Sequence, residues 1–165
     1  MSKAYLLLGS NKGNRLAFIN QATDDICKRV GNIITYSLIY ETETWGFIDN
    51  TFFLNKVLIV ETNLKPQQLL TELKTIELKL GRIKTSFYAS RTIDIDILFY
   101  DNLIISDENL IIPHPQLHKR MFTLLPLSEI APDFIHPLLN KDLQTLTNEC
   151  EDKTKVNLYY QEKLI

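Results

Sequence analysis

The sequence predicts a single α+β domain, and three observations carry this prediction. Segments rich in β-branched and aromatic residues alternate with two amphipathic segments of helical period. Within residues 90–99, isoleucine alternates with aspartate at the period of a strand that buries one face. A length of 165 residues with 45% hydrophobic residues is typical of one globular domain, which we place over residues 1–165.

Charge and cysteine content narrow the class of protein further. The net charge is −2 without a basic run, which argues against long nucleic acid as a partner. Cys27 and Cys150 are far apart in sequence and lack CxxC spacing, so we expect free thiols in a reducing compartment. The N-terminal apolar run is too short for a signal peptide or a membrane span. We therefore expect a cytoplasmic protein without a membrane partner.

The sequence of residues 4–40 predicts a strand, a helix and a second strand. Residues 4–8 form an apolar strand, and the polar turn 9–14 leads into a helix whose N-cap is Asn14. Gly31 suits the C′ position that ends this helix, and residues 33–40 form the second strand. The helix's inner face consists of Leu16, Ile19, Thr23, Ile26 and Val30.

The next elements complete the predicted sheet. Residues 52–61 form the third strand, after which a helix begins at Pro66 and stops at Gly81. Residues 90–99 form the fourth strand. The order strand, helix, strand, strand, helix, strand is that of a ferredoxin-like βαββαβ sandwich with an antiparallel sheet and both helices on one face. We expect the other face to be left free for ligands.

The remaining segments are predicted as additions to this core. Residues 82–90 lack periodicity and are either a connector or a mobile lid, and their basic residues favour the lid. Residues 103–105 and 110–112 suit an accessory C-terminal hairpin. Pro126 suits the first turn of a short helix that runs to Ile130.

The paired aspartates are the strongest chemical signal. Asp94 and Asp96 project from one face, with Cα atoms about 6.6 Å apart, so they can converge on one or two hard cations. Arg91, which begins the predicted strand, favours a phosphate ligand nearby. A half-exposed strand with an acidic outer face remains the alternative. The opposite face is buried by Ile93, Ile95 and Ile97.

Other side chains extend this pattern. Phe53 and Asn55 share a strand face, where an aromatic ring beside an amide suits a flat heterocycle, although simple packing is the alternative. Glu77 lies at the edge of an apolar helix stripe, or on a solvated flank. Basic residues flank the aspartate strand, which phosphoryl-type transfer would require and ordinary surface charge would also explain. They are Arg82, Lys84, Arg91, His114, Lys119 and Arg120.

Together these residues resemble one family, 6-hydroxymethyl-7,8-dihydropterin pyrophosphokinase. The resemblance runs from about residue 4 to residue 146 and leaves a C-terminal tail, 147–165, outside it. The matching motifs are Gly9-Ser10-Asn11, Leu54-Asn55, Glu77, Gly81-Arg82, the stretch 91–98, Pro113-His114-Pro115, Arg120, Phe122 and Pro126-Leu127.

The resemblance implies an ATP- and magnesium-dependent diphosphotransferase of folate biosynthesis. It implies that the β,γ-pyrophosphoryl group of ATP moves to the pterin's hydroxymethyl oxygen, giving the pterin diphosphate and AMP. Two Mg²⁺ ions bound with ATP would be held by Asp94 and Asp96, which with Arg82 and Arg91 form the implied catalytic set. The implied ATP-binding residues are Glu77, Lys84, Tyr88, Arg91, Ile97, His114 and Arg120. The implied pterin-binding residues are Thr42, Glu43, Thr44, Trp45, Phe53, Asn55 and Phe122.

The chain departs from the family pattern in two loops. Lys84 replaces a frequent arginine, which turns a bidentate phosphate grip into a point-charge contact. Tyr88 and Ser90 replace a usual tryptophan and a usual proline, and Thr44 and Trp45 replace a more proline-rich pterin loop.

Two rival functions differ in their partners. Two-metal nucleotidyl transfer would need a basic template track, and a small-molecule sensor or assembly module would bind its ligand without metal. We expect ATP and the pterin as partners, and a monomer or a weak dimer.

Overall fold

The computed structural model describes residues 1–43, 52–81 and 92–159. Its elements are β1 (Ser2–Ser10), α1 (Arg15–Arg29), β2 (Gly31–Tyr36), β3 (Tyr40–Thr42), β4 (Phe53–Thr62), α2 (Pro66–Lys79), β5 (Asp94–Tyr100), β6 (Ile105–Ser106), β7 (Ile111–Ile112), the 3₁₀ helix η1 (Leu117–Lys119), α3 (Met121–Ile130), α4 (Leu143–Glu149) and β8 (Val156–Leu158). Among these helices, none combines the length and the apolarity that crossing a bilayer requires.

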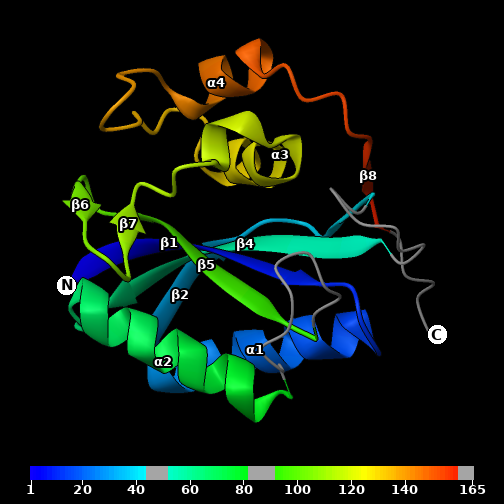
Figure 1. The fold of residues 1–165 in the computed structure, drawn as a ribbon, viewed down its shortest axis with the longest axis vertical. Helices are drawn as coiled ribbons and strands as arrows, with labels where there is room; N and C mark the ends of the chain where they lie inside the picture. The colour runs from blue at the N-terminus through cyan, green and yellow to red at the C-terminus, as the bar shows by residue number, and fades with distance from the viewer. Residues whose placement is uncertain (44–51, 82–91, 160–165) are drawn as a thin grey trace.

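A mixed α/β fold is built around one antiparallel sheet, as the sequence predicts. Its strand order is β5–β1–β4–β3–β8, and β2 also pairs with β4 (Figure 1). The long central strands β1 and β4 pair continuously from Ser2↔Thr62 to Ser10↔Leu54. The predicted accessory hairpin is confirmed as the short pair β6 and β7, in which Ile105 lies opposite Ile112.

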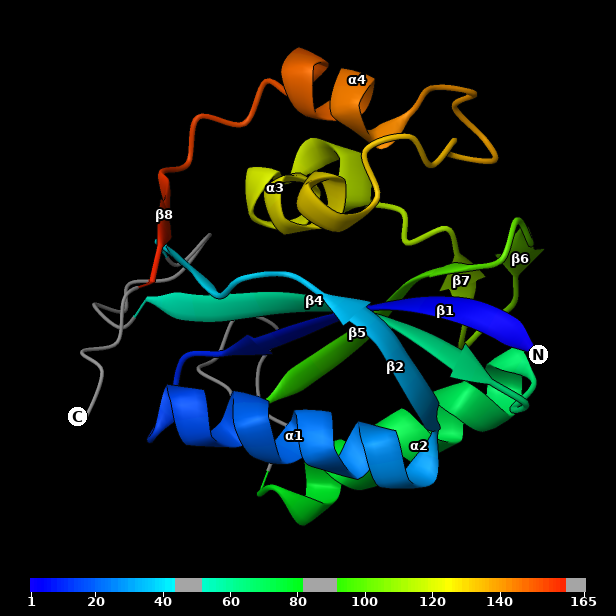
Figure 2. The ribbon, with the colours of Figure 1, turned by 180° about the vertical axis from the view of Figure 1, so that it is seen from behind.

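The sheet is covered on both faces. Helices α1 and α2 lie on one face, against a buried cluster that includes Ala4, Leu6 and Leu8 of β1. Helices α3 and α4 lie on the other face, against Tyr5 and Leu7 (Figures 1 and 2). The expectation that this second face is left free is therefore wrong over much of its area. The reason is visible in β1, whose residues are apolar on both sides and demand a cover on each.

The predicted second strand, 33–40, is divided into β2 and β3. Ser37 lies at the break, where its Oγ accepts a hydrogen bond from the Val57 N–H at 2.9 Å and donates to the Leu38 carbonyl at 2.7 Å. A side chain that bonds locally in this way replaces part of the strand ladder. The register with β4 also shifts between Ile33 and Thr35.

Two glycines near helix ends have different roles. Gly81 follows α2 with φ +86°, the left-handed conformation expected of a helix terminator. Gly31 follows α1 and its C-cap Val30, but a Cβ there would lie 1.9 Å from the Glu61 carbonyl oxygen. Gly31 is thus required by the close approach of β2 to β4, which differs from the helix-ending role expected of it.

Helix starts are only partly as predicted. Asn14 caps α1, because its Oδ1 accepts a hydrogen bond from the Ala17 N–H at 3.1 Å, and Pro66 begins α2. Pro126, in contrast, lies inside α3, which begins at Met121. The helix tolerates this proline because burial of Leu124 and Leu127 in the second core outweighs the one lost backbone hydrogen bond.

Candidate active site

The predicted pterin platform and the predicted magnesium pair meet across one glycine. In the sheet register, Gly9 of β1 lies opposite Asn55 of β4 on one side and opposite Asp94 of β5 on the other. In the neighbouring row with the same side-chain direction, Leu7 lies opposite Asp96. The two aspartates and Asn55 therefore share the sheet face that carries α3 and α4, at the end toward Gly9.

Gly9 keeps space open between these groups. A Cβ at this position would lie 2.9 Å from Asn55 Nδ2 and 3.6 Å from Phe53 Cδ1. A side chain at this position would displace the Asn55 amide, whereas it would meet the Phe53 ring at an ordinary contact distance. From the sequence alone Gly9 is expected in a turn, although a glycine that ends an apolar strand is the signal for such close approach.

Asn55 is held in a fixed orientation. It is 3% exposed, its Oδ1 accepts a hydrogen bond from the Thr42 hydroxyl at 3.3 Å, and its Nδ2 donates to the Leu8 carbonyl at 3.5 Å. Thr42 is buried as well and belongs to β3, where it pairs with Phe53. The predicted pterin residues Thr42, Phe53 and Asn55 are thus adjacent, and Glu43 follows Thr42 on the exposed surface.

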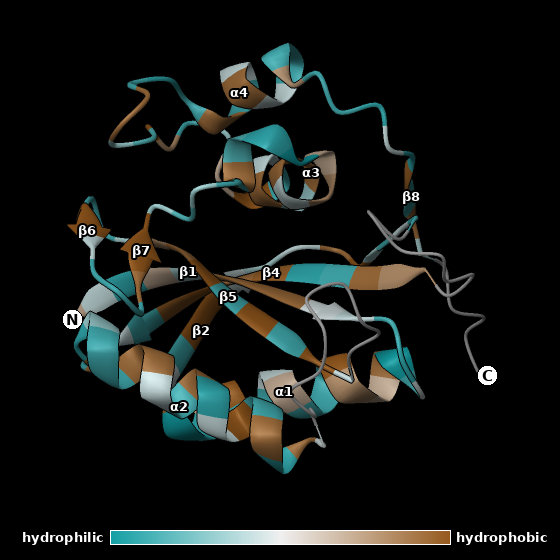
Figure 3. Cartoon of the chain, viewed as in Figure 1, coloured by the Kyte–Doolittle hydropathy of each residue, from teal (hydrophilic) through white to brown (hydrophobic). Residues whose placement is uncertain are grey.

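The alternation of the aspartate strand is confirmed. Asp94 and Asp96 are half-buried on one face, whereas Ile93, Ile95 and Ile97 are at most 5% exposed on the other. Hydrophobic and hydrophilic colours accordingly alternate along β5 in Figure 3. The strand begins at Asp94, later than predicted. The pairing of β5 with β1 starts there, where Asp94 lies opposite Gly9.

The donor set around the aspartates fits a magnesium–phosphate complex. Asp94 and Asp96 supply hard carboxylate oxygens, and no group of three or more candidate ligands occurs in the described part of the chain. Two carboxylates completed by phosphate oxygens and water are the usual composition of such a magnesium site. The buried Thr92 Oγ1, two residues before Asp94, has no hydrogen-bond partner among the described residues.

His114 faces the same site as a neutral group. Its Nε2 lies 4.0 Å from Asp96 Oδ2, and its Nδ1 accepts a hydrogen bond from the Gln116 N–H at 3.1 Å. Burial and the charge of Arg120, opposed by Asp94, lower the pKa of His114 to about 4. At neutral pH, His114 therefore carries its proton on Nε2 and presents a donor rather than a positive charge.

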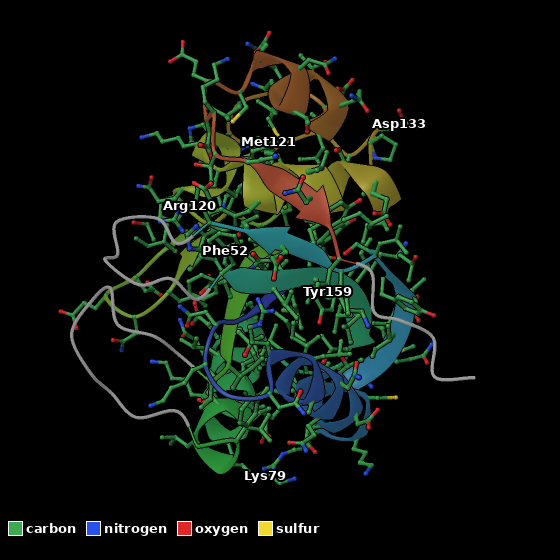
Figure 4. The ribbon with its side chains drawn as sticks, turned by 90° about the vertical axis from the view of Figure 1, so that its right-hand side faces the viewer. Phe52, Lys79, Arg120, Met121, Asp133 and Tyr159 are labelled. Atoms are coloured by element: carbon green, nitrogen blue, oxygen red, sulfur yellow. The ribbon has the colours of Figure 1, made fainter. Side chains whose placement is uncertain are left out.

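Arg120 and Phe122 enter the site from the start of α3. The Arg120 guanidinium lies 5.6 Å from the centroid of the Phe122 ring. Figure 4 shows Arg120 on the same flank of the molecule as Phe52, which precedes β4. The start of α3 thus places a cation close enough to act on His114, next to an aromatic ring that packs against the second core cluster.

The side chains of Glu77 and Ile97, both predicted to bind ATP, make contacts within the protein. Glu77 is 8% exposed, and its Oε2 accepts a hydrogen bond from the Ile95 N–H at 2.8 Å. The Ile97 side chain is buried in the core, so a ligand at this edge strand would meet its backbone. The suggestion that Glu77 is a solvated flank is therefore wrong.

Several predicted residues lie outside the described part of the chain. They are Thr44, Trp45, Arg82, Lys84, Tyr88, Ser90 and Arg91, together with the predicted lid 82–90. Their roles stay predictions. Asp152, in contrast, is not predicted from the sequence as a site residue; it contacts the start of α3 by accepting a hydrogen bond from the Met121 N–H.

Comparison with known proteins gives one consistent family. A family model described as 7,8-dihydro-6-hydroxymethylpterin-pyrophosphokinase matches residues 5–132. A 2-amino-4-hydroxy-6-hydroxymethyldihydropteridine pyrophosphokinase of Aquifex aeolicus is 41% identical over 149 residues, which cover 90% of this chain and 92% of the relative. The enzyme of the same name from Porphyromonas gingivalis is 42% identical over 141 residues, covering 83% and 95%.

Longer proteins match over a part of their length. The folic acid synthesis protein fol1 of Pneumocystis carinii is 44% identical over 134 residues, which cover 81% of this chain and 18% of that protein. A Plasmodium falciparum HPPK-DHPS structure superposes with a TM-score of 0.75 at 21% identity, covering 90% of this chain and 44% of the other. A second HPPK-DHPS structure, in complex with substrates, gives a TM-score of 0.72 at 20% identity, covering 89% and 43%. These two likenesses concern the fold.

Proposed function

The chain belongs to the 7,8-dihydro-6-hydroxymethylpterin-pyrophosphokinase family, and from this premise we propose how its described residues serve the reaction. It is a pyrophosphokinase of folate biosynthesis. The reaction moves the β,γ-pyrophosphoryl group of ATP to the hydroxymethyl oxygen of 6-hydroxymethyl-7,8-dihydropterin and leaves AMP. Such a transfer depends mainly on positioning and on neutralising charge around the migrating group.

The row Asn55–Gly9–Asp94 is the observation that carries this proposal. Asn55 is oriented by Thr42 and can pair with a flat heterocycle that has donor and acceptor edges. Asp94 lies in the same row, one strand beyond Gly9. A pterin bound at Asn55 would therefore lie in the same row of the sheet as the Asp94 carboxylate.

Asp94 and Asp96 are the proposed holders of two Mg²⁺ ions that arrive with ATP. Their oxygens are the hard ligands that magnesium prefers, and they leave most coordination positions to phosphate and water. When bound, the metal supplies charge neutralisation on the phosphate oxygens. Asp94 and Asp96 would also fix where the pyrophosphoryl group lies relative to the pterin.

The surrounding residues bind and orient the two reactants. Phe53 and Phe122 are the proposed stacking partners of the pterin ring. His114, neutral with its proton on Nε2, would donate to a phosphate oxygen, and Arg120 would add positive charge from the start of α3. The remaining proposed ATP-binding and catalytic residues are Glu77, Arg82, Lys84, Tyr88, Arg91 and Ile97.

We also propose a finer fold assignment, a cellular compartment and an oligomeric state. The strand order β5–β1–β4, with β2 next to β4 and with α1 and α2 on one face, supports a ferredoxin-like plan. The free thiols Cys27 and Cys150 support a reducing compartment such as the cytoplasm. We propose a monomer, or a weak dimer, as the active unit.

Substitution of the aspartates tests the metal-holding role. We expect Asp94→Ala and Asp96→Ala each to lower turnover by about a thousandfold or more, because each removes a hard ligand. Pterin affinity, measured by calorimetry, should change only modestly, because that site is built by other residues. Asp133→Ala, at an exposed aspartate near the opposite end of the molecule from Lys79 (Figure 4), is the matched control. Turnover near the wild-type rate in both aspartate variants would contradict the role.

A further inference from the structure

The C-terminal segment 150–159 lies outside the family match, which ends at residue 132. It leaves α4, passes the start of α3 and ends as β8, paired with β3 at the sheet edge (Figures 1 and 2). The segment therefore connects the cover layer to the sheet close to the proposed site. Its contacts at the two ends fall on residues that neighbour proposed ligand-binding groups.

The first contact is made by Asp152. Its Oδ2 accepts a hydrogen bond from the Met121 N–H at 2.9 Å, and its Oδ1 accepts one from the Thr154 N–H at 2.9 Å. Met121 is the first residue of α3, and the N-cap residue Arg120 makes no capping hydrogen bond with its side chain. Asp152 thus caps α3 from a distant part of the sequence, where a local side chain would ordinarily do so.

The electrostatics favour this arrangement. Burial opposes ionisation of Asp152, but the hydrogen bonds from Thr154 and Met121 and the charge of Arg120 outweigh it and hold the pKa of Asp152 below its usual value. Asp152 is therefore ionised at neutral pH. A carboxylate at the N-terminus of α3 also complements the helix dipole.

The hydrogen bond from α3 to Asp152 comes from a backbone position that lies between two proposed ligand residues. Arg120 and Phe122 are the immediate neighbours of Met121 in sequence. An uncapped first turn of a helix frays, and fraying here would displace both side chains together. Displacement of about 1 Å at positioning residues is enough to weaken binding and turnover strongly.

The second contact holds β3, the strand that carries Thr42 beside Asn55. In the β3–β8 pair, Val156 lies opposite Thr42, whose hydroxyl orients Asn55. The Tyr159 N–H donates to the Ile39 carbonyl at 2.9 Å, and the Arg15 guanidinium lies 5.8 Å from the centroid of the Tyr159 ring. One short segment thus holds both the α3 side and the β3 side of the site.

We propose that Asp152 is a positioning residue, which holds Arg120 and Phe122 in their ligand-binding arrangement through its cap on α3. This inference rests on the proposed function, in which Arg120 contacts phosphate and Phe122 stacks on the pterin. Asp152 itself touches no reacting atom. The C-terminal segment then belongs to the working site, although it lies beyond the family match.

Asp142 offers a matched control for the test. It caps α4, where its Oδ1 accepts a hydrogen bond from the Thr145 N–H at 2.7 Å. Asp152→Ala and Asp142→Ala each remove one helix cap from the same layer, so they should lower the melting temperature by similar amounts. Asp152→Asn keeps an oxygen that can accept one of the two hydrogen bonds, and it covers the case in which Asp152→Ala fails to fold.

The readouts are KM for the pterin, KM for ATP, and kcat. We expect Asp152→Ala to raise the KM values about tenfold, with kcat falling less, because positioning of bound groups is lost. Asp152→Asn should fall between wild type and Asp152→Ala, and Asp142→Ala should keep wild-type kinetic constants. Kinetic constants for both Asp152 variants equal to those of Asp142→Ala would overturn the positioning role. A folded wild-type protein that forms no AMP would instead contradict the proposed function itself.

Discussion

The Glu77 carboxylate of α2 accepts a hydrogen bond, at 2.8 Å, from the backbone N–H of Ile95, the residue between the two aspartates of β5. Because β5 is an edge strand, this N–H would otherwise lack a partner from a neighbouring strand. Glu77 thus supplies a missing ladder contact and fixes the strand that carries Asp94 and Asp96. A side chain assigned to ATP from the family resemblance has a structural role as well.

Replacing Glu77 should therefore cost stability. Glu77→Leu leaves the buried Ile95 N–H unsatisfied, and we expect the free energy of unfolding to fall by about 1–3 kcal/mol. Urea denaturation measures this change. Glu72→Leu on the same helix removes an exposed ion pair with Arg29 and should cost less than about 1 kcal/mol. Equal losses in the two variants would refute the structural role of Glu77.

Gly9→Ala should weaken pterin binding selectively. The new Cβ would lie 2.9 Å from Asn55 Nδ2, which forces the amide or the strand to shift. We expect the dissociation constant for the pterin to rise about tenfold or more, equivalent to about 1.4 kcal/mol. Calorimetry with an ATP analogue and Mg²⁺ on the same variant controls for general damage. Unchanged pterin affinity would show that Gly9 does not shape this site.

Thr42→Val should loosen Asn55 without unfolding the chain. The substitution keeps the shape of the side chain but removes the hydroxyl that donates to Asn55 Oδ1. We predict a pterin KM raised about three- to tenfold, in line with the modest net worth of one hydrogen bond. Thr62→Val is the counterpart at the far end of β4, where the hydroxyl donates to the Val30 carbonyl at 2.7 Å. If both variants change the pterin KM equally, the orientation of Asn55 is not the cause.

His136 should make stability fall in mild acid. Its Nδ1 accepts hydrogen bonds from the Leu138 and Leu139 N–H groups, each at 3.1 Å, which requires the neutral ring. Burial first, and then the charge of His118, lower the pKa of His136 from 6.5 to about 4, against a smaller opposing effect of its own backbone. The unfolded chain therefore binds this proton first as pH falls.

The pH dependence of the unfolding free energy follows from that order of protonation. The contribution of His136 to stability is fully present above pH 6.5 and is lost as pH falls toward 4, with a slope of at most about 1.4 kcal/mol per pH unit. His136→Asn keeps an acceptor but does not titrate, so its unfolding free energy should fall less between these pH values. Parallel pH curves for the two proteins would rule out His136 as the titrating group.

Local patterns predicted much of this structure. The common face of Asp94 and Asp96 follows from the period of a strand, and the Asn14 cap and the Pro66 start follow from the chemistry of helix ends. These features depend on neighbours a few residues away. The site row across Gly9 was only partly predictable, because the register of β1 with β4 and β5 depends on long-range pairing.

Features that depend on tertiary contacts could not be predicted from the sequence. The cover of Tyr5 and Leu7 by α3 and α4 could not be predicted from β1 alone, since an apolar strand face does not say what packs on it. Pro126 was predicted in the first turn of a helix, but α3 begins at Met121, because burial of the residues next to Pro126 stabilises helix on both sides of it. The cap supplied by Asp152 reaches Met121 from the segment between α4 and β8, and no local sequence motif predicts it.

The most direct test of the account is product analysis by ³¹P NMR of purified protein with ATP, Mg²⁺ and 6-hydroxymethyl-7,8-dihydropterin. Transfer of the β,γ-pyrophosphoryl group predicts AMP and the pterin diphosphate in equal amounts, with formation abolished by a metal chelator. Formation of ADP with a pterin monophosphate, or no product from protein shown to be folded, would contradict the account.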